Sequence, residues 1–151
     1  MMEVEKRSKD YARMFDQQVG LYEDYARGHG LNAKCLSILM WIYYNPGGVT
    51  QNWVSKKTYS SKQVVNATVK KFLDGGLVVL EENPADKRHK KIKLTEEGQQ
   101  FASRILDPLE EAENKALSQL SQEEQELMLG LIQRYSQSLM AILKGEGEED
   151  D

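Results

Sequence analysis

The sequence predicts a mainly α-helical protein with a small β-hairpin in its second half. Three observations lead to this prediction. Apolar residues recur at intervals of three and four over much of the 151-residue chain. Clusters of glycine, proline and asparagine divide this pattern into segments of helix length. At residues 77–80 and 91–94 the helical spacing gives way to two short runs rich in valine, isoleucine and leucine, which are typical of strands.

Two helices are predicted in the N-terminal third. Residues 6–27 carry aromatic and glutamine side chains at helical intervals, and Gly28 and Gly30 end this helix because glycine tolerates the left-handed conformation. Asn32 is expected to cap a second helix, which the segment Asn45-Pro46-Gly47-Gly48 ends. The inward positions of that helix, spaced i, i+3, i+4 and i+7, are Cys35, Ile38, Leu39 and Ile42.

A pair of short helices and a hairpin follow. Thr50 is expected to cap a third helix that runs to about residue 57, and Ser61 a fourth that runs to about residue 74. Gly75 and Gly76 end the fourth helix, and a charged loop containing Asn83-Pro84 joins the two predicted strands. The inward positions of the fourth helix are Val65, Val69 and Phe72.

The C-terminal third is predicted to form two more helices and a tail. Thr95 caps the first of them, and Pro108 lies inside its span, so we expect a kink or a break near residue 107. Ser121 and Glu124 form a capping box for a last helix that runs to about residue 143. Residues 145–151 are acidic and carry nothing to bury, so they are predicted to be disordered.

Charge is distributed unevenly along the chain. The net charge is −4, but residues 54–94 carry ten basic and four acidic side chains, whereas residues 95–151 carry four basic and fourteen acidic ones. A basic middle third in an acidic protein indicates a localised surface that binds a polyanion. The alternative is that these lysines only solubilise a helical surface.

Two short helices joined by a tight turn, then a lysine-rich hairpin, have the local order of a winged helix-turn-helix. In that arrangement the start of the second helix enters the major groove of DNA and meets base edges. The residues at this position are Ser61, Lys62, Gln63, Val64 and Asn66. Lys70 and Lys71 lie further along the helix, where contact with phosphate is expected.

The hairpin carries a longer motif. Residues 86–98 fit the pattern D-x-R-x-x-x-(I/V)-x-L-T-x-x-G at every fixed position. With this motif, and with helix starts at Val49-Thr50-Gln51 and Ser61-Lys62-Gln63 and a turn at Gly76-Leu77-Val78, the chain resembles the MarR (multiple antibiotic resistance regulator) family over about residues 8–143. It departs from the family at Ala67, often arginine there, and at Val64, often threonine, which leaves the recognised DNA sequence open.

The resemblance implies a terminal-helix dimerisation region at residues 1–31 and 96–144, a winged helix-turn-helix lobe at residues 32–95, and the tail at 145–151. It implies a homodimeric transcriptional regulator that binds a pseudo-palindromic double-stranded DNA operator, as a repressor released by a small phenolic or amphipathic effector or by a stress signal. Residues implied at the DNA backbone are Thr50, Gln51, Lys70, Lys71 and Lys90.

The resemblance also assigns roles at the wing. Arg88 would enter the minor groove beside Lys87, and Asp86 would hold it by a charge-assisted hydrogen bond. The alternative is a surface hairpin with an incidental Asp–Arg pair.

Aromatic side chains concentrate in the first two predicted helices. In the resembled family, effectors bind between the dimer helices and the DNA-binding lobe, and such a ligand pocket would be lined by Tyr11, Tyr22, Trp41 and Tyr44. Plain core and dimer contacts are the favoured interpretation for most of them, and the environment of Trp53 is left open. The last helix carries an apolar stripe wide enough to indicate burial against a second subunit, with an intrachain hairpin as the weaker alternative.

Other sites and functions are disfavoured by the sequence. Cys35 is interpreted as a buried small hydrophobe, with a redox sensor as the alternative, and His29 and His89 as solvated loop residues, so neither a metal nor another cofactor is expected. The sequence has no phosphate loop, nucleophile elbow or acid–base pair, which argues against an enzyme. Without an export signal or a run of roughly 20 apolar residues, the chain is expected in the cytoplasm and not in the membrane. The alternative function is a winged-helix module that binds a partner protein and not DNA.

Overall fold

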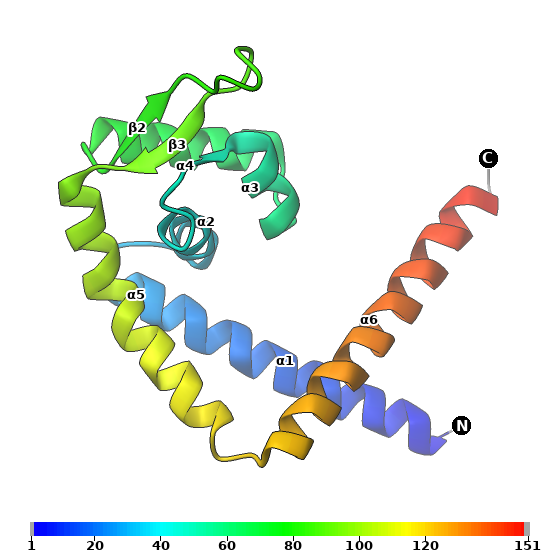
Figure 1. Ribbon diagram of the computed structural model, residues 1–151. Coiled ribbons are helices and arrows are strands. Elements are labelled where there is room, and N and C mark those ends of the chain that lie inside the picture. The colour runs from blue at the N-terminus through cyan, green and yellow to red at the C-terminus, as the bar shows by residue number, and fades with distance from the viewer. Residues whose placement is uncertain (1, 150–151) are drawn as a thin grey trace. The chain divides into compact units, whose positions relative to one another are not determined.

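The computed structural model describes residues 2–149. Within that range the chain is mainly helical with one small antiparallel sheet, as the sequence predicts (Figure 1). The elements in order are α1 (Met2–Gly28), α2 (Ala33–Tyr43), β1 (Val49–Thr50), α3 (Gln51–Thr58), α4 (Lys62–Asp74), β2 (Val78–Glu81), β3 (Lys91–Leu94), α5 (Glu96–Leu117) and α6 (Gln122–Glu149). The chain divides into two compact units between Asp107 and Pro108.

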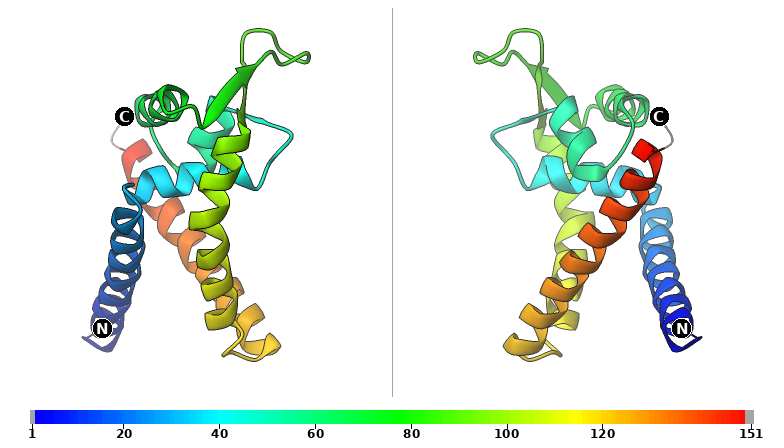
Figure 2. Two further views of the ribbon diagram at one scale, coloured as in Figure 1. Left: turned by 90° about the vertical axis from the view of Figure 1, so that its left-hand side faces the viewer. Right: turned by 90° about the vertical axis from the view of Figure 1, so that its right-hand side faces the viewer.

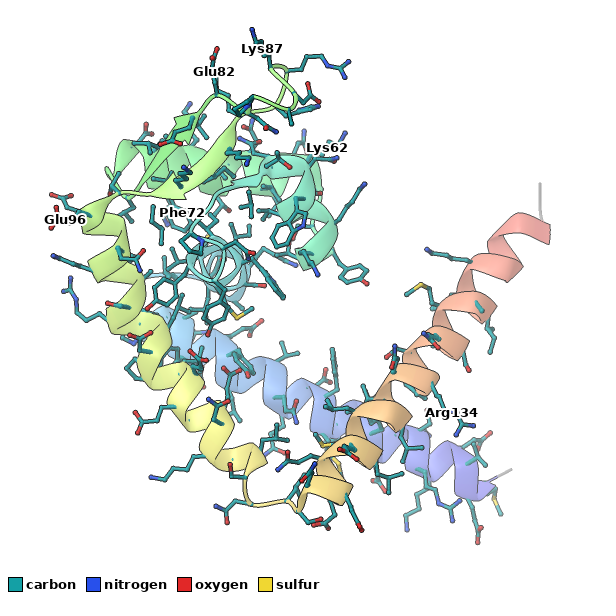
Figure 3. The ribbon with its side chains drawn as sticks, viewed as in Figure 1. Lys62, Phe72, Glu82, Lys87, Glu96 and Arg134 are labelled. Carbon is teal, nitrogen blue, oxygen red and sulfur yellow. The ribbon has the colours of Figure 1, made fainter. Side chains whose placement is uncertain are left out.

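The first unit is built around α2. This helix contacts α1, α3, α4 and β3, and its apolar stripe is almost completely buried. Phe72 of α4 points into the same interior (Figure 3). Burial of this much apolar surface is the main force that holds the short helices together, because helices of 8 to 13 residues are marginal alone. The largest buried side chains are Ile38, Leu39, Ile42, Val54, Val65, Val69, Phe72, Ile92 and Leu106.

The sheet has three strands, and β3 lies between β1 and β2. The hairpin partners include Val78 opposite Leu94 and Glu81 opposite Lys91. The first strand, β1, was not predicted, because a two-residue strand carries no periodic signal of its own. It pairs Val49 with Ile92, so the segment before α3 is hydrogen-bonded to the middle of the wing. The loop between β2 and β3 projects away from the helices of this unit in every view (Figures 1 and 2).

The predicted helix caps are confirmed. The side chain of Asn32 accepts a hydrogen bond from the Cys35 amide at 2.7 Å, and the Thr50 hydroxyl accepts one from the Trp53 amide at 3.1 Å. The Ser61 hydroxyl accepts one from the Val64 amide at 3.2 Å. Each cap satisfies a backbone donor that has no partner within its own helix.

Three boundaries differ from the predictions. The first helix begins at Met2 and not near residue 6, because Glu3, Val4 and Glu5 continue the helix without a breaker. Strand β2 begins one residue later than expected, at Val78. Of the two outcomes expected at Pro108, a kink or a break, the break does not occur, because helix α5 continues through this residue.

The last difference concerns the predicted tail. Helix α6 continues to Glu149, so the backbone of residues 145–149 is helical where disorder was predicted. Extending a helix that is already nucleated is less costly than starting one, even through Gly145 and Gly147, and a prediction from composition does not include this cooperativity. Residues 150 and 151 lie outside the described residues.

The second unit consists of the remainder of α5 and of α6. The capping box at its turn is confirmed: the Glu124 carboxylate accepts a hydrogen bond from the Ser121 amide at 2.8 Å, and the Ser121 hydroxyl accepts one from the Glu124 amide at 3.1 Å. The exposed carboxylate has a pKa below its usual value, chiefly because of the hydrogen bond from the Ser121 amide. Among residues 2–149, no helix combines the length and the apolar character that crossing a bilayer requires.

Candidate nucleic-acid interface

Helix α4 has one buried face and one exposed face. Val65, Thr68 and Val69 point into the lobe, while the opposite face is polar and accessible. The exposed side chains near the start of the helix are Lys62, Gln63, Val64 and Asn66, and Lys70 and Lys71 continue the same surface. Ser61 is also exposed, but its hydroxyl is engaged as the helix cap. The predicted groove-reading residues therefore all lie at the surface of the lobe.

The turn between α3 and α4 is fixed by hydroxyl groups. Ser55 donates a hydrogen bond to the Ser60 carbonyl at 2.6 Å, and Thr58 donates one to the Val54 carbonyl at 2.8 Å. The hydroxyls of Thr58 and Ser60 lie 2.7 Å apart. Between them, Tyr59 adopts the left-handed conformation with φ of 51°, and its side chain is 85% exposed. This network sets the angle at which α4 leaves α3.

The wing loop contains the predicted Asp–Arg pair. Asp86 Oδ1 accepts hydrogen bonds from the Arg88 backbone amide at 3.1 Å and from Arg88 Nε at 3.3 Å. The Arg88 side chain is 86% exposed. Its guanidinium therefore faces solvent, while its backbone amide and Nε are held by the Asp86 carboxylate. Lys87 lies beside it and projects from the loop (Figure 3). Asp86 and Arg88 are therefore hydrogen-bonded to each other, as predicted.

The wing and the helix pair are joined through β1. Thr50, which caps α3, also pairs with Lys91 of β3. On the other side of β3, Lys93 Nζ lies 2.7 Å from the Glu81 carboxylate of β2. Gln51 is the first residue of α3, and Lys90 is exposed immediately before β3. Backbone pairing therefore sets the position of the wing relative to α3.

A hollow of about 290 Å³ lies where these parts meet. It is lined by Gln51 and Asn52 at the start of α3, Lys62 at the start of α4, and His89 of the wing loop. Sequence reasoning selected Gln51 and Lys62 but missed Asn52 and treated His89 as a solvated loop residue. No local pattern could have linked them, because three separate elements bring the four residues together.

The four aromatic residues proposed as a ligand pocket are found in different surroundings. Trp41 packs edge-on against Trp53 with ring centroids 5.9 Å apart, and Lys57 Nζ lies 5.2 Å from the Trp41 centroid and 5.5 Å from the Trp53 centroid. Tyr44 packs against Tyr43, and Tyr11 and Tyr22 are partly exposed on α1. The environment of Trp53, which the sequence left open, is therefore this Trp–Trp–Lys cluster.

A second hollow, of about 400 Å³, lies where α1 meets α2. Its lining comes from the end of α1 and the start of α2, and it contains none of the four aromatic residues. The lining residues are Glu23, Arg27, Leu31, Asn32, Ala33 and Lys34.

Cys35 is buried in the first unit, whereas His29 is exposed and contacts one aromatic ring. The Cys35 thiol is buried, with Sγ 3.7 Å from the Thr68 hydroxyl of α4, which agrees with its interpretation as a small core residue. The His29 ring packs on Tyr25 with centroids 4.8 Å apart. Within residues 2–149, no group of three or more His, Cys, Asp or Glu side chains is placed to hold a metal ion.

Comparison with known proteins points to one family. Residues 29–89 match the model of the MarR family. A segment of 87 residues is 30% identical to the transcriptional regulator HosA of Escherichia coli O111:H-, and this match covers 58% of the chain and 64% of the length of that relative.

Solved structures share the fold over nearly the whole chain. A MarR family regulator from Neisseria meningitidis superposes with a TM-score of 0.80 at 16% identity, covering 93% of this chain and 98% of the other. Staphylococcus aureus MepR in its DNA-binding conformation gives 0.76 at 22% identity, covering 88% and 98%. The MepR–DNA complex gives 0.70 at 22% identity, covering 85% and 97%. The family match over residues 29–89, the curated relative and the shared fold agree: this segment matches the MarR family, and the chain has the fold of its winged helix-turn-helix proteins.

Proposed function

We propose that the chain is a sequence-specific double-stranded DNA-binding transcriptional regulator that catalyses no reaction. One observation carries this proposal: the exposed polar face of α4 and the arginine-tipped wing belong to one lobe whose parts are tied by backbone pairing. An α-helix fits the major groove, and a guanidinium is attracted to the negative potential of the minor groove. Acting on chromosomal DNA, such a regulator belongs in the cytoplasm.

Each exposed group has a role in this proposal. Lys62, Gln63 and Asn66 donate hydrogen bonds to base edges, and Val64 contacts a thymine methyl. Arg88 enters the minor groove, held by Asp86 and flanked by Lys87. Contacts with the phosphate backbone set the register and are assigned to Thr50, Gln51, Lys70, Lys71 and Lys90. Ser61 fixes the start of α4 by accepting the capping bond, and its hydroxyl proton can still be donated to the DNA.

The relatives support this proposal. HosA is described as a transcriptional regulator, and MepR has been solved in complex with DNA.

A homodimer is part of the proposal. Helix α1 buries only Ala26 within this chain, although it carries exposed Met14, Phe15 and Leu21. Helix α6 exposes nine large apolar side chains by 42% to 62%. Monomeric proteins rarely leave so much apolar surface on one helix uncovered, so a second copy of the chain is the occupant that we propose. Two lobes related by a two-fold would read a pseudo-palindrome with half-sites about one helical turn apart.

Regulation is proposed to act through the spacing of the two lobes. The dimer can adopt a lobe spacing that fits the operator and one that does not. An effector that binds the second state more tightly lowers the DNA affinity by the difference between its binding energies for the two states. We propose repression by occupation of a promoter, released by a small phenolic or amphipathic compound.

The test begins with selection of bound duplexes from a random pool, where a palindromic consensus is expected. Lys62→Ala and Arg88→Ala should each weaken binding to the selected duplex by about 1–3 kcal/mol. The matched controls are Lys115→Ala and Arg104→Ala, which remove exposed charges from α5. Lys71→Ala should make the slope of log K against log salt shallower by about 0.9 per contact. Unchanged affinity in both lobe variants at matched salt, or a stable monomer by light scattering, would contradict the proposal.

A further inference from the structure

We propose that the hollow between α3, α4 and the wing holds a backbone phosphate of the bound DNA, and that His89 makes DNA binding tighter as the pH falls. This inference rests on the proposed function. It adds two DNA contacts, Asn52 and His89, that the proposed function does not include. It also adds a response to pH.

The hollow is suited to a phosphate by the groups that line it. Gln51 and Asn52 offer amide donors, and His89 offers an imidazole. Lys62 offers one of the three donors of its ammonium group, and the other two are left for the base edge assigned to it. None of the four lining residues carries a negative charge. A phosphodiester oxygen only accepts hydrogen bonds and is negative, so every lining side chain can contribute a favourable contact.

The location of the hollow also fits this occupant. It lies between the start of α4, assigned to the major groove, and the wing loop, assigned to the minor groove. The sugar–phosphate backbone is what separates the two grooves of a duplex. Lys62 and Lys87 both project outward from the lobe, from α4 and from the wing loop (Figure 3). A strand that passes between these elements therefore passes over the hollow.

Histidine is the side-chain type that can change its charge near neutral pH, and His89 is the histidine in this lining. Charged groups near it are Asp86, whose Oδ2 lies 3.9 Å from His89 Nε2, and Lys62, which lines the same hollow. Helix α3 contributes only the uncharged Gln51 and Asn52. The Asp86 carboxylate is shared with Arg88, whose Nε lies 3.3 Å from Oδ1. A phosphate in the hollow adds a second negative partner, so binding DNA and binding the proton reinforce each other.

The experiment measures affinity for the selected duplex by fluorescence anisotropy at pH 5.5 and pH 8.0 and at matched salt. The wild type should bind about threefold to tenfold more tightly per lobe at pH 5.5, since one linked proton changes affinity by at most about tenfold per pH unit. His89→Gln should lose this difference. His29→Gln is the matched control, because His29 is the other histidine of the chain. It packs on Tyr25 and does not line the hollow. This variant should keep the full pH response.

Two further measurements separate a phosphate contact from a general structural effect. At pH 5.5, His89→Gln should make the slope of log K against log salt shallower by about 0.9 per lobe, and at pH 8.0 it should leave the slope unchanged. Asn52→Ala should weaken binding about fivefold at both pH values, because it removes a neutral donor.

A wild type with equal affinities at the two pH values would overturn the inference, as would a pH response that survives His89→Gln. Either result, obtained together with steep salt dependence and loss of binding in Arg88→Ala, leaves the proposed function standing. No binding to any duplex in dilute buffer would overturn both.

Discussion

Gly98 lies in the first turn of α5, where this helix passes directly over the backbone of Leu77. A Cβ at this position would lie 1.8 Å from the Leu77 carbonyl oxygen, 2.8 Å from its carbonyl carbon and 3.2 Å from its Cα. These are backbone atoms, which cannot rotate aside as the end of a flexible side chain could. Gly98→Ala therefore forces the start of α5 away from the turn that precedes β2.

The cost follows from the contacts that hold these two segments together. The Thr95 amide donates a hydrogen bond to the Leu77 carbonyl at 2.9 Å, and the Thr95 hydroxyl donates one to the Gly76 carbonyl at 2.7 Å. Weakening both costs about 2 kcal/mol. Overpacking adds about 1–3 kcal/mol. Alanine returns about 1 kcal/mol through its higher helix propensity. The net expectation is a loss of about 3 kcal/mol in the free energy of unfolding.

Urea unfolding followed by circular dichroism, at one protein concentration, measures this loss. The matched control is Gly28→Ala at the end of α1, where an added Cβ meets nothing within 4 Å and φ is not positive. It should range from no effect to about 1 kcal/mol of added stability. If Gly98→Ala unfolded within about 0.5 kcal/mol of the wild type, the explanation of this glycine by close backbone approach would be refuted.

Three further predictions concern single residues. Tyr59→Gly should raise the free energy of unfolding by about 0.5–1 kcal/mol, because φ is 51° there; Tyr59→Ala, which keeps the strain, should not. The Tyr25 hydroxyl donates a hydrogen bond to the Ile105 carbonyl, and burial raises its pKa. The stabilisation from this protonated hydroxyl is complete below the usual tyrosine pKa and is lost as the pH rises through the raised pKa. Tyr25→Phe should cost about 1 kcal/mol at pH 7, and a cost that does not shrink in urea titrations above pH 10 would contradict this. The hydrogen bond from the Ser121 amide is the chief cause of the lowered pKa of Glu124. The ionised carboxylate therefore stabilises the fold above the usual glutamate pKa, and this stabilisation is lost as the pH falls through the lowered pKa. Glu124→Gln should flatten the decline of the thermal midpoint between pH 5 and pH 3.

Features that depend on neighbouring residues could be predicted from the sequence. The caps at Asn32, Thr50 and Ser61 were located to the residue, because a cap joins groups two or three positions apart. The capping box at Ser121 and Glu124 was found for the same reason. Strand β3 was predicted with its observed bounds.

Features that depend on distant partners could not. Strand β1 forms because Val49 pairs with Ile92, and a two-residue segment carries no sequence pattern that predicts this pairing. Local propensity allowed either a kink or a break at Pro108, and the helix continues there as part of the longer α5. The Trp41–Trp53 contact joins two helices whose apolar patterns are each complete without it.

By itself the sequence determined the order of the helices, the basic middle third, the exposed face of α4 and the motif of the wing, because each follows from local spacing and composition. Only the tertiary structure decided why Gly98 must be glycine and which residues line the hollow that His89 shares with Asn52 and Lys62. The physical reason is the same in both cases. A steric limit or a concave surface is produced by atoms from elements far apart in the chain, and it exists only after the core has brought them together.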